Sequence, residues 1–193
     1  MNFKEELNYT SQTLALTGEK SQKIVDEIVE IIFNAFKNEK KLLLCGNGGS
    51  AADAQHFAGE LTSSFNPNLI RPSFPAIALT TNTSVITAYA NDFSFNSIFA
   101  RQIEGLGKPG DIIVILTTSG SSKNCIEAAV KSREMNLTSV AFTSSNAEIS
   151  SLVDYAIEIP SKNTQQIQTA HLVVYHYICR KIEEKWIKNK SYE

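Results

Sequence analysis

The sequence predicts an α/β fold in which a doubly wound parallel sheet carries helices on both faces. Short apolar runs alternate with segments of helical length, as in repeated βαβ units. The 193 residues are 42% hydrophobic, which is enough for one compact domain with a full core. We expect a single domain over residues 1–193, with helices in residues 1–39 and the sheet core and a long C-terminal helix in residues 40–193.

The expected elements follow one another along the chain. Apolar residues recur at helical spacing over residues 3–16 and 20–38, which predicts two helices. A strand at residues 42–45 runs into a glycine turn, and a helix over residues 51–61 follows. Further strands are expected at residues 76–79, 112–116, 139–142 and 155–159.

The last predicted helix, over residues 164–188, has almost no polar stripe. A helix that is apolar all round must be buried. In a chain of this size, a second subunit is one way to cover it. We therefore expect an oligomer.

Charge and cysteine content limit the classes of partner. The chain has 18 Lys and Arg against 20 Asp and Glu, a net charge of −2, so neither nucleic acid nor a membrane surface is an expected ligand. Its three cysteines lack metal-ligand spacing and favour a reducing compartment. With no secretory signal and no apolar run approaching the roughly 20 residues of a membrane span, a cytoplasmic location is expected.

The glycine turn consists of Gly46, Asn47, Gly48, Gly49 and Ser50. It matches the dinucleotide fingerprint formally, but the second strand lacks the acidic residue that would hold a ribose. A P-loop motif is also absent. The turn therefore predicts either close approach of a phosphate to a helix N-terminus or a tight turn without a ligand.

A second turn carries five hydroxyls where a strand meets a helix. They belong to Thr117, Thr118, Ser119, Ser121 and Ser122. Hydroxyls and free backbone N–H groups can together bind a phosphate monoester, although one serine could serve only as a cap. Since ligands collect beyond the carboxyl ends of parallel strands, both turns should face one crevice.

Candidate acid-base groups lie on two helices. His56 and Glu60 are four residues apart and share a helix face, where they could bind a metal or substrate or form a surface hydrogen bond. Gln168, His171 and His176 are embedded among apolar residues of the last helix, as ligands or as satisfied core groups. Gln168 and His176 are roughly 12 Å apart along the axis, so they could meet only by reaching inward or from different subunits.

The sequence resembles the phosphoheptose isomerases of the sugar-isomerase (SIS) fold from about residue 5 to residue 185. The motifs that carry this resemblance are CGNGGSAADAQHFAGEL, ANDF, RQIEGLGKPGD, TSGSSKN and QIQTAH. The family has a flavodoxin-like sandwich and interconverts sedoheptulose 7-phosphate and D-glycero-D-manno-heptose 7-phosphate for bacterial lipopolysaccharide or capsule. The resemblance implies the same phosphorylated seven-carbon sugar as substrate.

Site residues follow from the resemblance position by position. The residues implied to bind the substrate are Asn47, Gly48, Gly49, Ser50, Glu60, Asn91, Asp92, Thr117, Thr118, Ser119, Ser122 and Gln168. One zinc ion per subunit is implied on His56, Glu60, Gln168 and His176. Glu60 is the expected base that moves a proton between C1 and C2, and His176 is the expected acid. The family is tetrameric, so residues 1–39 are expected to serve oligomerisation.

Two alternatives to this substrate and activity remain open, one from departures from the family pattern and one from a related class of SIS protein. Ser63-Ser64 stands where family members commonly have Gly-Arg, and Thr169 where many have Glu, which allows a related sugar phosphate as substrate. A non-enzymatic SIS protein that binds the replication initiator is the other alternative. That class lacks the Glu and the His at the positions of Glu60 and His176.

Overall fold

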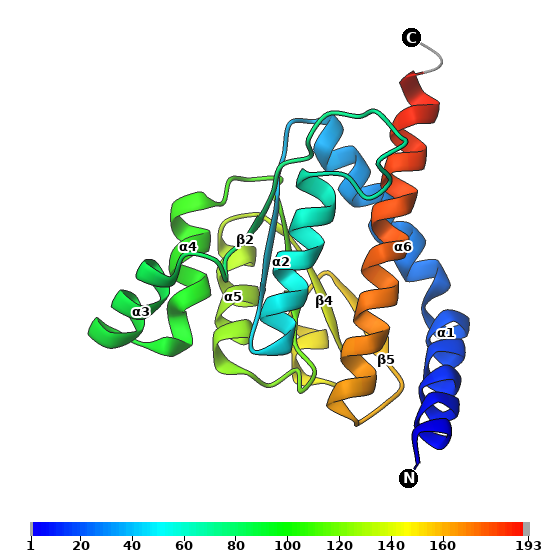
Figure 1. The fold of residues 1–193 in the computed structure, drawn as a ribbon. Coiled ribbons are helices and arrows are strands. Elements are labelled where there is room, and N and C mark those ends of the chain that lie inside the picture. Colours follow the sequence, from blue (N-terminus) through cyan, green and yellow to red (C-terminus); the bar gives the residue numbers. More distant parts are fainter. Residues whose placement is uncertain (1, 191–193) are drawn as a thin grey trace.

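The fold is built on a fully parallel sheet of five strands (Figure 1). A computed structural model describes residues 2–190. Within it the strands lie in the order β2-β1-β3-β4-β5. Their bounds are β1 Leu42–Gly46, β2 Ala76–Ala78, β3 Ile112–Leu116, β4 Thr138–Ser144 and β5 Tyr155–Ile159. The predicted doubly wound α/β fold is confirmed.

Helices cover both faces of this sheet (Figure 1). They are α1 Phe3–Lys37, α2 Gly49–Thr62, α3 Thr83–Asp92, α4 Ile98–Leu106, α5 Lys123–Glu134 and α6 Thr164–Lys190, with 3-10 turns η1 Phe95–Ser97 and η2 Glu148–Ser151. Helices α1, α2 and α6 pack on one face, and α4 and α5 on the other. In the described part of the chain, no helix has the length and apolarity of a membrane span.

Strand residues alternate between two hydrophobic cores. In β1, Leu42 and Leu44 join the core under α1, α2 and α6, whereas Leu43 and Cys45 join the core under α4 and α5. All five residues of β1 and of β3 are buried. A parallel sheet covered on both faces needs such continuous apolar strands, and the sequence supplies them.

The first helix is one element of 35 residues, so the prediction of two helices was wrong. Asn2 caps it, accepting from Glu5 N while Glu5 accepts from Asn2 N. The helix runs through Gly18, because one interior glycine costs only about 1 kcal/mol. A buried stripe that includes Thr13, Thr17 and Ser21 continues across that position and offsets the cost.

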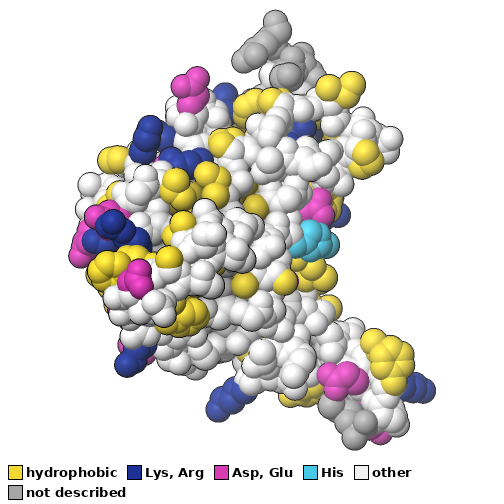
Figure 2. All heavy atoms as spheres, turned by 60° about the vertical axis from the view of Figure 1, so that its left-hand side comes forward, with side chains coloured by type: hydrophobic (Ala, Val, Ile, Leu, Met, Phe, Trp, Pro, Cys, Tyr) yellow, Lys and Arg dark blue, Asp and Glu magenta, His cyan; other side chains and the backbone are white. Residues whose placement is uncertain are grey.

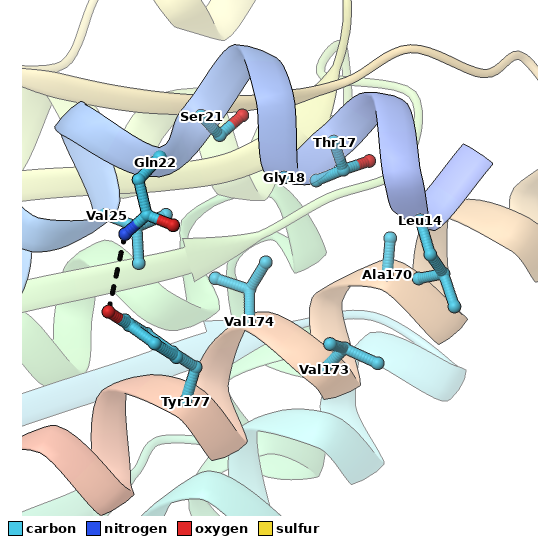
Figure 3. A pocket seen from close by; sticks show the side chains of 10 residues that line it. All are labelled: Leu14, Thr17, Gly18, Ser21, Gln22, Val25, Ala170, Val173, Val174 and Tyr177. Atoms are coloured by element: carbon cyan, nitrogen blue, oxygen red, sulfur yellow. Dashed lines mark hydrogen bonds between the residues drawn. The ribbon is translucent and has the colours of Figure 1, made fainter. Parts of the chain in front are cut away.

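Helix α6 lies between α1 and α2 and is buried for most of its circumference (Figure 1). Val173 is an exception at 48% exposed. It lines an apolar groove of about 140 Å³ between α1 and α6, where Tyr177 accepts a hydrogen bond from Gln22 at 3.3 Å (Figure 3). Packing within one chain therefore covers most of the apolar surface that the sequence placed on this helix.

A buried ion pair ties α6 to the end of α2. Arg71 Nε donates to Glu183 Oε1 at 2.7 Å, and each side chain is only 1% exposed. Glu183 also accepts from the backbone N–H groups of Phe65 and Asn66, while Arg71 donates to the carbonyl oxygen of Glu60 at 2.8 Å. The pair thus holds the loop after α2 against α6 and fixes the helix end that carries Glu60.

Removing one partner of this pair should destabilise the chain strongly. Glu183→Leu leaves the Arg71 guanidinium buried without a counter-charge, and we expect the free energy of unfolding to fall by about 3–5 kcal/mol. Urea denaturation measures this change. Glu184→Leu is the matched control, since Glu184 makes only surface ion pairs with Arg180 and Lys181 and should cost less than about 1 kcal/mol. Equal losses in the two variants would contradict this account.

Candidate active site

The glycine turn and the hydroxyl-rich turn line one cavity of about 310 Å³. This confirms the prediction that both turns face a common crevice at the carboxyl ends of the strands. The lining residues are Asn47, Gly48, Gly49, Ser50, Leu116, Thr117, Thr118, Ser119, Ser122, Thr164 and Gln168. Nine of the residues implied to bind substrate are among them, and Thr164 is an addition that the sequence did not suggest.

Two glycines are required where α2 begins. Gly48 has a φ of +56°, a conformation that L side chains rarely adopt. A Cβ on Gly49 would lie 2.5 Å from Nε2 of Gln168. The absence of side chains therefore lets the turn form and lets Gln168 of α6 approach the first turn of α2.

A reciprocal pair of amides joins the two turns. Asn47 Nδ2 donates to Asn124 Oδ1, and Asn124 Nδ2 donates to Asn47 Oδ1, both at 2.8 Å. Asn124 is 2% exposed and lies in the first turn of α5. The sequence analysis missed Asn124, although its position just after the hydroxyl-rich turn could have suggested a contact with the other turn.

The cavity suits an anion without offering a cationic side chain. Helices α2, α5 and α6 begin at Gly49, Lys123 and Thr164, so the N-terminal ends of three helices lie at the cavity. Free N–H groups and the helix dipole favour negative charge at such ends. No Lys or Arg is among the lining residues, so hydroxyls and backbone N–H groups are the available donors.

A second group of polar side chains combines α2 with α6. His56 Nε2 and Glu60 Oε1 are 2.9 Å apart on α2, and ligand atoms of these two residues and His176 all lie within 4.8 Å of one another. Histidine atoms reach the surface beside an acidic side chain on the face shown in Figure 2. The His56 side chain is 46% exposed and that of Glu60 is 22% exposed. This triad is therefore accessible from solvent.

The triad has the donors that a divalent metal ion requires. Two imidazoles and a carboxylate are ordinary ligands of zinc. His176 Nε2 is buried and has no hydrogen-bond partner. Burial lowers the pKa of His176, nearby His56 lowers it further and Glu60 opposes this, so the imidazole is neutral at neutral pH with a lone pair to offer.

Two neighbours of the triad were missed by the sequence analysis. The Tyr175 hydroxyl lies 2.9 Å from His56 Nδ1, and burial is the main reason that the pKa of Tyr175 is raised. Asp53 lies one turn before His56. Burial raises the pKa of the Asp53 carboxyl, while His56 and the Tyr175 hydroxyl lower it. Tyr175 sits in an apolar run of α6 that predicts core packing, so no sequence signal marked it.

Other expected site residues lie apart from the triad. Gln168 is two helical turns before His176 on α6 and lies at the cavity lined by the two turns, where Gly49 is its neighbour. Asn91 and Asp92 are the last residues of α3, where Asn91 Nδ2 donates to Asp92 Oδ1 at 2.8 Å. Both are exposed, and neither is among the cavity-lining residues or the triad.

The SIS domain model matches residues 7–144. The chain belongs to the SIS domain family. Phosphoheptose isomerases of Clostridium acetobutylicum and Aquifex aeolicus are 43% and 45% identical to it, over 86% and 89% of this chain and 84% and 88% of theirs.

Solved structures of family members share the fold. The phosphoheptose isomerase of Neisseria gonorrhoeae matches with a TM-score of 0.87 and 32% identity, over 93% of this chain and 96% of that chain. The one from Francisella tularensis matches with a TM-score of 0.89 and 31% identity, over 95% and 100%.

His171 belongs to the core rather than to the triad, and it should make stability depend on pH. It is fully buried, neither ring nitrogen has a hydrogen-bond partner, and burial lowers its pKa from 6.5 to about 3. Between these values the unfolded chain binds a proton that the folded chain does not. The free energy of unfolding should therefore fall as the pH drops below 6.5, by about 2 kcal/mol from this group at pH 5.

Denaturation with urea at pH 7 and pH 5 measures this loss. His171→Leu removes the titrating group, so the variant should lose about 2 kcal/mol less than the wild type over the same interval. An identical loss in both chains would contradict the assignment.

Proposed function

We propose that this protein is an aldose-ketose isomerase that converts D-sedoheptulose 7-phosphate to D-glycero-D-manno-heptose 7-phosphate. Its role would be cytoplasmic, in the supply of heptose for bacterial surface polysaccharide. One observation supports this proposal most directly: His56 and Glu60 of α2 lie close to His176 of α6. The relatives of the chain that have this function in their names are phosphoheptose isomerases. The hydroxyl-lined cavity on the same two helices adds a place for the phosphate.

The substrate phosphate would be held by neutral donors. The hydroxyls of Thr117, Thr118, Ser119 and Ser122 and the N–H groups at the start of α2 surround the cavity. Such preorganised donors stabilise an anion without a nearby cationic side chain. The reciprocal amides of Asn47 and Asn124 would keep the two turns at a fixed separation during turnover.

Glu60 would carry the proton between the two reacting carbons. Aldose and ketose differ by one hydrogen moved between C1 and C2 and one moved between O1 and O2. The carboxylate takes the proton from the hydroxyl-bearing carbon, an enediol forms, and the same carboxyl returns the proton to the neighbouring carbon. One side chain that reaches both carbons suffices, and Glu60 is part of the accessible triad.

His176 would move the oxygen-bound proton. Because burial keeps its pKa low, the imidazole is neutral at neutral pH, so it acts first as a base toward the hydroxyl. The imidazolium so formed then donates to the other oxygen. The expected role as an acid is thereby kept, because the imidazole that accepts the proton from one oxygen donates it to the other.

A zinc ion held by His56, Glu60 and His176 would supply a Lewis acid for the carbonyl oxygen of the substrate. Since a carboxylate or imidazole bound to zinc is a weaker base, Glu60 and His176 would alternate between binding the ion and transferring a proton. Gln168 is the proposed fourth ligand. Because it lies two turns from His176, beside Gly49, it would reach this triad from a second copy of the chain. The metal site would then depend on assembly.

A homotetramer is the proposed assembly, with residues 1–39 in its contacts. Leu7 and Leu16 on α1 are 53% and 43% exposed, and Val173 on α6 lies in the apolar groove beside α1 (Figure 3). Burial of such surface between subunits is favourable by about 25 cal/mol per Å². These residues give a second copy an apolar surface on which to pack.

Glu60→Gln tests the catalytic assignment. The amide cannot accept a proton from carbon, so turnover of sedoheptulose 7-phosphate in a coupled assay should fall at least about 100-fold. The melting temperature should stay near that of the wild type. Glu104→Gln, at an exposed position of α4, is the control and should keep full activity. Near-normal turnover in Glu60→Gln would rule out Glu60 as the base.

Val173→Glu tests the assembly. A charge in the groove between α1 and α6 should oppose burial against another subunit, and light scattering should show a mass below that of four chains. Val130→Glu is the matched control, because Val130 is 45% exposed on α5, on the opposite face of the sheet. A single-chain mass for the wild type would refute the tetramer.

A further inference from the structure

Tyr175 presents a fixed hydroxyl to the triad from inside the core. The residue is fully buried on α6, and its ring stacks on Phe57 with centroids 5.1 Å apart and an interplanar angle of 15°. The rings of His56 and His176 meet it edge to face at 5.5 and 5.0 Å. Because these contacts hold the ring, the position of the hydroxyl is determined by packing.

Both ring nitrogens of His56 are thereby engaged. The Tyr175 hydroxyl lies 2.9 Å from Nδ1, and Glu60 Oε1 lies 2.9 Å from Nε2. With 46% of its side chain exposed, His56 has less packing than Tyr175 to hold its ring. Of the two hydrogen bonds to the ring, the one to Tyr175 comes from a fully buried side chain and holds Nδ1 toward the core, which leaves Nε2 facing Glu60.

We propose that Tyr175 is a positioning residue that holds His56 with Nε2 directed at Glu60 and His176, where a divalent cation binds. The inference rests on the metal site of the proposed function and adds to it a residue outside the ligand set. Partners of this kind orient metal-binding histidines and typically change metal affinity 10- to 100-fold when removed.

A hydroxyl is suited to this position because it can both donate and accept. A neutral imidazole carries one proton. While Nε2–H donates to Glu60, the Tyr175 O–H donates to Nδ1. When Nε2 binds a cation, the imidazole proton lies on Nδ1 and is donated to the Tyr175 oxygen.

Asp53 provides an acceptor for the second arrangement. Its Oδ2 is buried and has no hydrogen-bond partner, and the carboxyl lies near enough to Tyr175 to interact with its hydroxyl. The Tyr175 O–H can therefore turn to Asp53 when its oxygen accepts from His56. Phenylalanine would keep the stacking on Phe57 but could serve neither arrangement.

Tyr175→Phe tests the proposal, with zinc as the probe. Competition with a chromophoric chelator, starting from metal-free full-length chain, should show zinc binding at least about 10-fold weaker than in the wild type. Tyr177→Phe is the matched control on the same helix, since the Tyr177 hydroxyl bonds to Gln22 and Asp26 instead. The control should bind zinc as the wild type does.

A spectroscopic measurement reports the hydrogen bond itself. The chain has three histidines, so labelling with ¹⁵N-histidine gives a small set of ring signals that a His56→Gln variant assigns. In metal-free Tyr175→Phe, the Nδ1 signal of His56 should move toward that of an imidazole nitrogen without a hydrogen bond. The same signal should stay unchanged in Tyr177→Phe.

The outcomes separate this proposal from the proposed function. If Tyr175→Phe leaves zinc affinity and the Nδ1 signal unchanged, the role of Tyr175 is overturned and the isomerase proposal stands. A wild-type chain that binds no zinc overturns both the role of Tyr175 and the metal of the proposed function, whereas the Glu60→Gln assay still decides the isomerase. If Tyr175→Phe fails to fold, Asp53→Ala is the second variant, because alanine removes the acceptor for the Tyr175 O–H. It should weaken zinc binding, and unchanged affinity there would overturn the proposal.

Discussion

The side-by-side packing of α2 and α6 on one face of the sheet is the constraint on which the rest of the site depends. Near the start of both helices, Gly49 and Gln168 lie next to each other beside the cavity lined by the two turns. Farther along the same two helices, His56 and Glu60 meet His176. One helix pair therefore positions both the cavity and the triad.

Two polar contacts fix the two ends of α2, one at the loop that follows it and one at the turn that precedes it. The Arg71–Glu183 pair fixes the end of α2 through the carbonyl oxygen of Glu60 and anchors the following loop to α6. The Asn47–Asn124 amides fix the opposite end, where α2 begins beside α5. Each places fully paired polar groups in the interior, so their desolvation is offset by hydrogen bonds.

The candidate site contains few charged side chains, and this limits the chemistry it can perform. The cavity offers hydroxyls and helix N-termini without a Lys or Arg among its lining residues, in keeping with a chain whose net charge is only −2. The triad contributes one carboxylate and two imidazoles, of which His176 is kept neutral by burial. In the proposed function, hydroxyls and backbone N–H groups would hold an anionic substrate, and the neutral imidazole of His176 would offer a lone pair for proton transfer or for a metal ion.

Local sequence patterns were sufficient to predict the order of the strands along the chain, the two turns that line the cavity and the closeness of His56 to Glu60. These depend on local patterns, namely apolar runs of strand length, glycines and hydroxyls at strand-to-helix junctions, and spacing along one helix. The division of α1 was predicted wrongly, because the apolar spacing breaks between residues 16 and 20, whereas the buried stripe of α1 continues through Thr17 and Ser21 and depends on packing against the rest of the core.

Tertiary packing brings His176 to His56 and Glu60, leaves Gln168 at the cavity, and places Tyr175 and Asn124 in contact with site residues. These contacts join residues 77 to 120 positions apart in sequence, through the packing of helices on a shared sheet, and no local pattern encodes such contacts.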